Sequence, residues 1–319
     1  MQISEFSLAV QQLYQQVKKK FSKEIHIDLN DTRQSWLAFD QSGHRIDEAG
    51  NLQIRLVQSA DLNFTLAHEL RHILLELDSA VAIYFPVTTT NPQLDQQIKA
   101  TAISLIGCVE HVLLTKQQRQ TKEITLEIEQ LFCAGVQQKL PDKEQQSDYF
   151  VFSVLVLLDS LVFSEGRDLN QWQVAYPKAY QAANKMYQDI LQPAKVEQIT
   201  GMRRTIVKLL QTFNQFLAKH HYQELPYQDF VAIQPILSAR QLRLNVDQVF
   251  KIKHLTYLSL ATRQPAYVLV GANDGQLVGD LHLDAKNVDT PQGYLAIYQQ
   301  TIQTFLQQQK LSYQLRPGG

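Results

Sequence analysis

The sequence contains little glycine and little cysteine, and it has no excess of charge of either sign. Its 319 residues include 12 glycines and 2 cysteines, and 30 Lys and Arg residues stand against 31 Asp and Glu residues. Cys108 and Cys133 form no CxxC pair, so neither a zinc ribbon nor a redox motif is predicted. The chain has no P-loop, dinucleotide fingerprint or GxSxG elbow. With a formal charge of -1, we expect no nucleic-acid partner.

Long hydrophobic runs are also lacking. The most apolar run covers residues 149–163 and is interrupted by Asp159. It is shorter than the roughly 18 to 20 residues that a membrane span requires, so we predict a buried helix and no membrane span. No charged segment followed by an apolar one marks a signal peptide at the N-terminus. Two unpaired cysteines suit a reducing compartment, and the expected location is therefore cytoplasmic.

The composition is that of an ordinary globular protein, with 45% hydrophobic and 19% charged residues. Apolar spacing predicts helices at 5–21, 64–77 and 94–115, and short strands at 24–29, 35–39 and 51–57. Residues 121–219 have helical spacing almost throughout, and 266–270 and 277–283 read as strands around an Asn273-Asp274-Gly275 turn.

These elements predict an α+β fold in three consecutive parts. The expected parts are a domain of a helix, a small sheet and two further helices over 1–120, a mostly helical region over 121–225, and a small α/β domain over 226–319. The boundaries lie where polar residues or prolines interrupt the periodic pattern.

One run carries recognisable chemistry, the HExxH sequence His68-Glu69-Leu70-Arg71-His72. Residues four apart on a helix lie on one face, about 6 Å apart along the axis. Two imidazoles placed in this way can bind the same zinc ion, and the adjacent glutamate can act as general base toward a zinc-activated water. We therefore predict that His68 and His72 bind zinc and that Glu69 is catalytic. The alternative is a pair of core histidines, with Glu69 and Arg71 in surface ion pairs.

A catalytic zinc site needs a third protein ligand, and the sequence offers two acidic candidates. Asp78 follows His68 by ten residues, but the sharp turn that would bring it back normally requires a glycine where Leu75 stands. Glu110 is a lone acid in the apolar stretch 103–114, and a buried carboxylate is costly unless it is paired or metal-bound. We predict Glu110 as the third ligand, with Asp78 as the alternative.

Two further residues are expected near this site. His111 could orient a ligand, donate to a developing oxyanion, or be the third ligand itself. Arg71 is a cation close to the expected metal, where it would oppose the charge of the ion unless it is paired. We expect it to meet an acid, with Glu76 and Glu110 as candidates, and otherwise to act on the oxyanion.

The segment from Phe64 to Leu75 resembles the zinc helix of the ImmA/IrrE-like bacterial metallopeptidases, which are zincins with a third ligand on the following helix. The resemblance extends over about residues 1–115 and includes the preceding helix and strands. It implies a zincin-like domain in which His68, His72 and a downstream glutamate bind zinc. The family usually has a small residue where this chain has Arg71.

Together, the motif and the resemblance predict a zinc metallopeptidase that hydrolyses peptide bonds in a peptide or protein substrate. The alternative function is a zincin-like regulatory or interaction protein that has no turnover and uses its helices as a scaffold.

Overall fold

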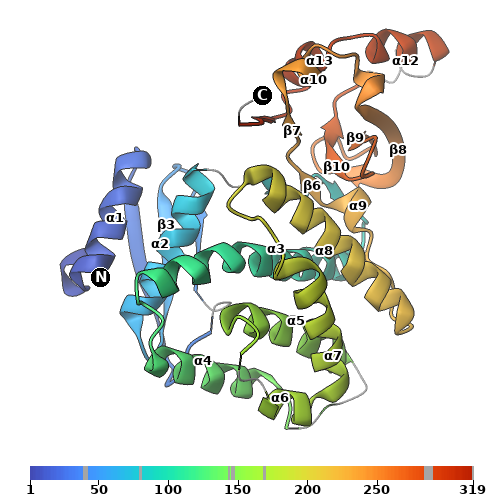
Figure 1. Cartoon of the computed structure of the whole chain (residues 1–319). Helices are drawn as coiled ribbons and strands as arrows, with labels where there is room; N and C mark the ends of the chain where they lie inside the picture. The colour runs from blue at the N-terminus through green and yellow to red at the C-terminus, as the bar shows by residue number, and fades with distance from the viewer. Residues whose placement is uncertain are drawn as a thin grey trace. The chain divides into compact units, whose positions relative to one another are not determined.

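The computed structural model (Figure 1) describes residues 1–38, 42–78, 81–142, 144, 148–167, 170–283 and 290–317. It is a mixed α+β structure, as the sequence predicted. Contacts between Cα atoms group the chain into two units: unit 1 is Met1–Ala80 with Cys108–Pro193, and unit 2 is Val81–Gly107 with Ala194–Gly319. This division differs from the three consecutive domains expected, because helix α3 (Pro92–Gln120) is continuous and contributes to both units.

Unit 1 combines a small sheet with helices. Its first elements are η1 (Ile3–Glu5), α1 (Leu8–Lys20), β1 (Ile25–Arg33), β2 (Gly43–Ile46), β3 (Leu52–Gln58) and α2 (Leu62–Asp78). After the second half of α3 come α4 (Leu126–Lys139), α5 (Asp148–Phe163), α6 (Asn170–Ala175), α7 (Pro177–Met186) and the π-helical turn η3 (Tyr187–Leu191).

The sheet of unit 1 has the order β1-β3-β2, with β1 parallel and β2 antiparallel to β3. Apolar residues of α1, the sheet and α2 form one core, which includes Val17, Ile54 and Leu70. Ser7 begins α1 by accepting a hydrogen bond from the backbone N–H of Val10, and three lysines lie in its last turn, where cations suit the helix dipole.

The strand predicted at 35–39 is wrong over its described part, 35–38, and the third strand is β2 instead. Leu37 explains the difference, because it is 2% exposed and its backbone N–H donates to the carbonyl of Leu131 in α4. This segment therefore packs against a helix. The predictions of strands near 24–29 and 51–57 are confirmed by β1 and β3.

The helical part of unit 1 is built around α5. Val154, Leu157, Leu158 and Leu161 of this helix have no exposed surface, which confirms that the most apolar run is a buried helix. Among the described residues, α3 is the helix that is long and apolar enough to cross a membrane, and half of its most apolar window is buried inside the protein. The buried core helix of a globular protein can have the same length and apolar composition, so these two properties alone do not indicate a membrane span.

Unit 2 is centred on an antiparallel sheet of order β10-β9-β8-β5. Its strands and helices are β4 (Ile83–Tyr84), β5 (Val87–Thr88), the first half of α3, α8 (Ile199–Lys219), α9 (Tyr227–Phe230), β6 (Ala232–Ile233), β7 (Ile236–Leu237), α10 (Ala239–Leu242), η4 (Val246–Gln248), β8 (Phe250–Ser259), β9 (Pro265–Gly271), β10 (Leu277–Leu281), α12 (Pro291–Tyr298), α13 (Ile302–Gln308) and β11 (Gln314–Leu315). The predicted turn between β9 and β10 is confirmed, with Gly275 at φ +67°.

Candidate metal centre

The HExxH run lies in the middle of α2, on a segment that is well anchored. Asp61 precedes the helix, and its side-chain oxygen accepts a hydrogen bond of 2.8 Å from the backbone N–H of Phe64. Nine residues of α2 are buried, among them His68 and Glu69. The helix therefore holds His68 and Glu69 inside the protein.

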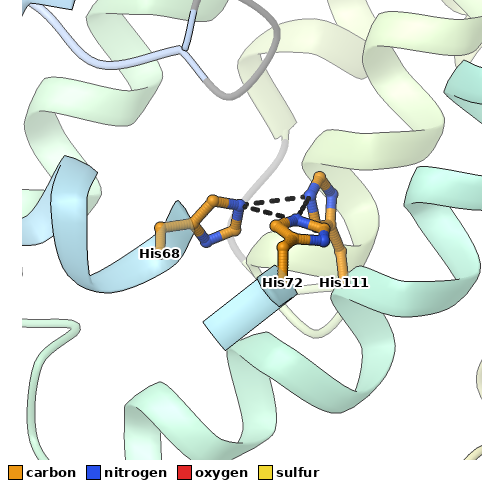
Figure 2. Close-up of side chains that lie close together, drawn as sticks. All are labelled: His68, His72 and His111. Carbon is orange, nitrogen blue, oxygen red and sulfur yellow. Dashed lines mark hydrogen bonds between the residues drawn. The ribbon is translucent and has the colours of Figure 1, made fainter. Parts of the chain in front are cut away.

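Three histidine rings meet in unit 1, two from α2 and one from the second half of α3. Figure 2 shows the rings of His68, His72 and His111 directed toward one another. Their Nε2 atoms form a nearly equilateral triangle: His68 to His72 is 3.2 Å, His72 to His111 is 3.2 Å, and His68 to His111 is 3.3 Å. Among the described residues, these three form the one group of side chains that could share a metal ion.

The size of this triangle matches a tetrahedral metal site. Nitrogen atoms bound to zinc at about 2.0 to 2.1 Å, with tetrahedral angles, are separated from one another by about 3.3 to 3.4 Å. The distances of 3.2 to 3.3 Å between the histidine nitrogens agree with this value. Three ligands would leave one tetrahedral position open for a water or a substrate oxygen.

The other nitrogen of each ring determines what the triangle can bind. Every Nδ1 atom faces an acceptor oxygen: that of His68 lies 3.2 Å from Gln118 Oε1, that of His72 lies 3.1 Å from Glu110 Oε2, and that of His111 lies 2.6 Å from Asp159 Oδ1. Each Nδ1 is placed to donate its hydrogen to that oxygen, and a neutral ring in this tautomer has its lone pair on Nε2. The three Nε2 atoms lie within hydrogen-bond distance of one another, and lone pairs directed at one point from neutral rings can bind one cation.

The pKa values follow from burial and from these partners. Burial lowers the pKa of His68 well below its ordinary value, and the charges of His72 and His111 lower it further. Burial also acts to lower the pKa of His111, but the charge and hydrogen bond of Asp159 outweigh it and raise that pKa. Burial acts to raise the pKa of Asp159, but the charge and hydrogen bond of His111, together with the charges of Lys139 and His72, outweigh burial and lower that pKa. Asp159 is therefore an anion against the ring of His111.

Glu69 is close to the triangle and almost completely buried. Its side chain is 5% exposed, and Oε2 lies 3.4 Å from Nδ1 of His44 on β2. The charge of Glu69 contributes to the raised pKa of His111, and Glu69 adjoins His68 on α2. A buried carboxylate next to a group of metal ligands has the position expected of a general base.

The structure brings the predicted residues together, but the third candidate ligand differs from the one expected. His68 and His72 converge as expected, and the third member of the triangle is His111 rather than Glu110. Glu110 contacts Nδ1 of His72 from outside the triangle. Adjacent residues on a helix point about 100° apart, so only one of the two can face the centre.

The remaining predicted residues are engaged elsewhere. Asp78 forms an ion pair with Lys20 of α1 and does not join the histidine group. Arg71 meets an acid, as expected, but this acid is Glu123 rather than Glu76 or Glu110. The guanidinium also donates to Thr121. The ion pair with Glu123 compensates its charge, so the guanidinium is not directed to an oxyanion.

Sequence reasoning missed Asp159, Gln118 and His44. Asp159 had a signal, because it is the single acid in the most apolar run of the chain, and the cost of burial that drew attention to Glu110 applies equally to it. Gln118 is fully buried, but it lies in a glutamine-rich stretch with no local pattern. His44 lies in β2, a segment for which the sequence predicted neither a helix nor a strand.

Comparisons with protein-family models, with curated proteins and with solved structures each found no match to this chain. The function of this chain is therefore inferred from the geometry of the site.

Proposed function

We propose that this chain is a zinc-dependent metallopeptidase with a zincin-like site, in which His68, His72 and His111 hold the metal and Glu69 is the general base. The observation that carries this proposal is the triangle of Nε2 atoms 3.2 to 3.3 Å apart, with an oxygen against each Nδ1. Neutral imidazoles of this kind suit zinc among the common metals of proteins.

The oxygens around the triangle also fit this function. Metal-binding histidines almost always donate their second N–H to a carboxylate or carbonyl, which fixes the ring and makes the ligand more basic. Glu110, Asp159 and Gln118 hold the three rings in this manner. Glu110 thus supports the site as an orienting group, while His111 takes the ligand role that was expected of Glu110.

A zinc ion held there would activate a water molecule and polarise a substrate carbonyl. The protein groups would supply the remaining steps. Glu69 would accept a proton from the attacking water and return it to the leaving amine, which is general base and then general acid catalysis by one carboxylate. The pairing of Arg71 with Glu123 supports this proposal, because it removes an uncompensated cation from the neighbourhood of the metal.

The fold around the site supports the zincin-like comparison. Helix α1, the three-stranded sheet, α2 and the second half of α3 all belong to unit 1, and α1, the sheet and α2 share one core. This is the order of elements that the resemblance implied. Helix α2, the second half of α3 and the sheet that packs against α2 are therefore all parts of unit 1.

The test is a pair of measurements on the full chain expressed in zinc-supplemented medium. We expect one equivalent of zinc per chain by elemental analysis, and cleavage of a quenched fluorescent casein. Glu69→Gln should keep the zinc and lose about 10²- to 10⁴-fold in cleavage rate, as removal of a general base does. Glu127→Gln, at an exposed position of α4, is the matched control and should behave as wild type.

Two outcomes would contradict the proposal in different ways. Zinc well below one equivalent would exclude the metal site itself. Retained zinc with equal cleavage by the wild type and Glu69→Gln would exclude the peptidase mechanism in which Glu69 is the base, and retained zinc with no cleavage by either would leave a non-catalytic zincin-like protein.

A further inference from the structure

His44 lies on β2, the edge strand of the sheet in unit 1, and its register directs it toward α2. In the antiparallel pair of β2 and β3, His44 is opposite Ile54. Residues directly opposite one another lie on the same face of a sheet. Ile54 is fully buried in the core shared with α2. The side chain of His44 is consequently on the α2 face, and it is 14% exposed.

Both nitrogens of the His44 ring contact carboxylates of α2. Nδ1 lies 3.4 Å from Glu69 Oε2, and Nε2 lies 3.1 Å from Glu76 Oε2. The two glutamates are seven residues apart, which places them on one face of the helix two turns from each other. One ring therefore connects the strand to two points on the helix.

This connection gives the buried Glu69 carboxylate a fixed orientation. An ionised carboxylate that is 5% exposed is costly unless a donor or a cation compensates for the lost water. We infer that His44 is a positioning residue, which holds the carboxylate of Glu69 in the orientation required for proton transfer at the open position of the metal. The inference builds on the proposed function and assigns to it a residue outside the HExxH motif.

The electrostatics of the ring agree with this role. Burial acts to lower the pKa of His44, but its hydrogen bonds to Glu69 and Glu76 and the charges of both outweigh burial and raise the pKa to about 10. The ring is then a cation with an N–H for each carboxylate at neutral pH. Glu76 is 55% exposed, so it anchors the outer side of the ring while Glu69 is held on the inner side.

The decisive variants separate orientation of Glu69 from general stability. His44→Phe keeps a ring and removes both donors, and we expect kcat on quenched casein to fall about 10- to 100-fold with zinc content retained and KM little changed. His44→Gln keeps one amide donor for Glu69 and should recover part of this loss. Glu76→Gln, which loosens only the exposed side, should cost about two- to five-fold.

His26 provides the matched control. It is a histidine of β1 in the same sheet, and it pairs with Glu24 at 3.3 Å on the exposed surface. His26→Phe removes a His–Glu pair of the same chemistry away from the metal centre. It should leave kcat, KM and zinc content at their wild-type values.

A second measurement does not depend on turnover. When Co²⁺ replaces zinc, its visible absorption reports on the groups around the open coordination position. We expect His44→Phe and Glu69→Gln both to shift these bands, and His26→Phe to reproduce the wild-type spectrum. A His44→Phe spectrum identical to that of the wild type would overturn the inference even if casein is not a substrate.

The failures of the two proposals are distinguishable. If Glu69→Gln cleaves as the wild type does, the proposed function fails. If Glu69→Gln abolishes cleavage while both His44→Phe and His44→Gln keep the wild-type kcat, the proposed function stands and the inference about His44 fails. A fall in kcat for His44→Phe with partial recovery in His44→Gln supports both.

Discussion

Units 1 and 2 both bury polar side chains, but they bury different kinds. Among the described residues, the buried polar groups of unit 2 are neutral: Thr205, Gln234, Ser259 and Gln276. Those of unit 1 include two histidines and a glutamate, namely His68, Glu69 and His111. Buried ionisable groups are expensive and gather where chemistry requires them, whereas buried neutral groups usually complete backbone hydrogen bonding.

Gln276 of unit 2 illustrates the structural case. It is fully buried, and its amide nitrogen donates to the backbone carbonyls of Tyr227 at 3.2 Å and Val231 at 2.6 Å. The charged pair Arg203 and Asp274, 2.6 Å apart, likewise matches one cation with one anion. These contacts satisfy each group locally. In unit 1, by contrast, three ring nitrogens point at a common centre, which is an arrangement that can bind a cation.

The largest expected effect concerns the third ligand. His111→Ala removes a nitrogen from the triangle, so its zinc affinity should fall by more than the 10- to 100-fold typical of an outer-shell change. Glu110→Gln removes only the carboxylate behind His72 and should stay within that range. Competition of each variant with a fluorescent zinc chelator measures both affinities. A weaker affinity in Glu110→Gln than in His111→Ala would return the ligand role to Glu110.

The next prediction compares one hydrogen-bonded polar side chain of each unit, Asp159 in unit 1 and Gln276 in unit 2. Asp159→Asn weakens the group that holds His111, and we expect zinc affinity to fall about 10- to 100-fold. Gln276→Leu leaves two carbonyls without their donor and should cost about 1–3 kcal/mol in unfolding free energy. Zinc affinity should be unchanged in Gln276→Leu. Chelator competition and urea unfolding of both variants test this separation, which a loss of zinc binding in Gln276→Leu would break.

The sequence was most informative where the site depends on local geometry. His68 and His72 are four residues apart on one amphipathic helix, so their convergence follows from the helical repeat alone. The choice between Glu110 and His111 is different in kind. It depends on the rotation of α3 about its own axis relative to α2, and a rotation of about 100° exchanges the two side chains. Tertiary packing fixes that angle, and no local pattern records it.

The fold shows the same limit. Helices α1, α2 and α3, the helical character of 121–219, and the strands β1, β3, β9 and β10 were predictable from apolar spacing and turn residues. The loss of a strand at 35–38 depends on Leu37 packing against α4, a contact with a distant segment. The grouping into two units depends on α3 being shared by both. Each of these properties is determined by contacts between residues far apart in the sequence.

A smaller effect is expected in the pH dependence of stability. The histidines whose pKa is raised, His44 and His111, both lie in unit 1. For His44, the pKa of about 10 in the folded chain exceeds the ordinary value of 6.5. Its stabilisation is therefore fully present below pH 6.5 and is lost as the pH rises through about 10. Because Glu76 is half exposed, solvent screening should reduce this contribution to about 1 kcal/mol.

This dependence is measured by urea unfolding of the metal-free protein between pH 6.5 and 10. The difference in unfolding free energy between the wild type and His44→Phe should shrink toward the alkaline end. A difference that is constant across the range would contradict the assignment of a charged His44 between two carboxylates.

The smallest effect is expected where the two units should behave alike, in their exposed ion pairs. Asp78 pairs with Lys20 in unit 1, and Asp229 pairs with Lys253 in unit 2, with all four side chains between 34% and 48% exposed. Asp78→Asn and Asp229→Asn should each cost less than about 1 kcal/mol, because solvent screens such pairs. Zinc affinity should stay within about two-fold of the wild type in both variants, since neither carboxylate belongs to the metal centre. A loss of more than about 100-fold in Asp78→Asn alone would make Asp78 a ligand in place of His111, and the distinction between a titratable site in unit 1 and neutral structure in unit 2 would have to be redrawn around that carboxylate.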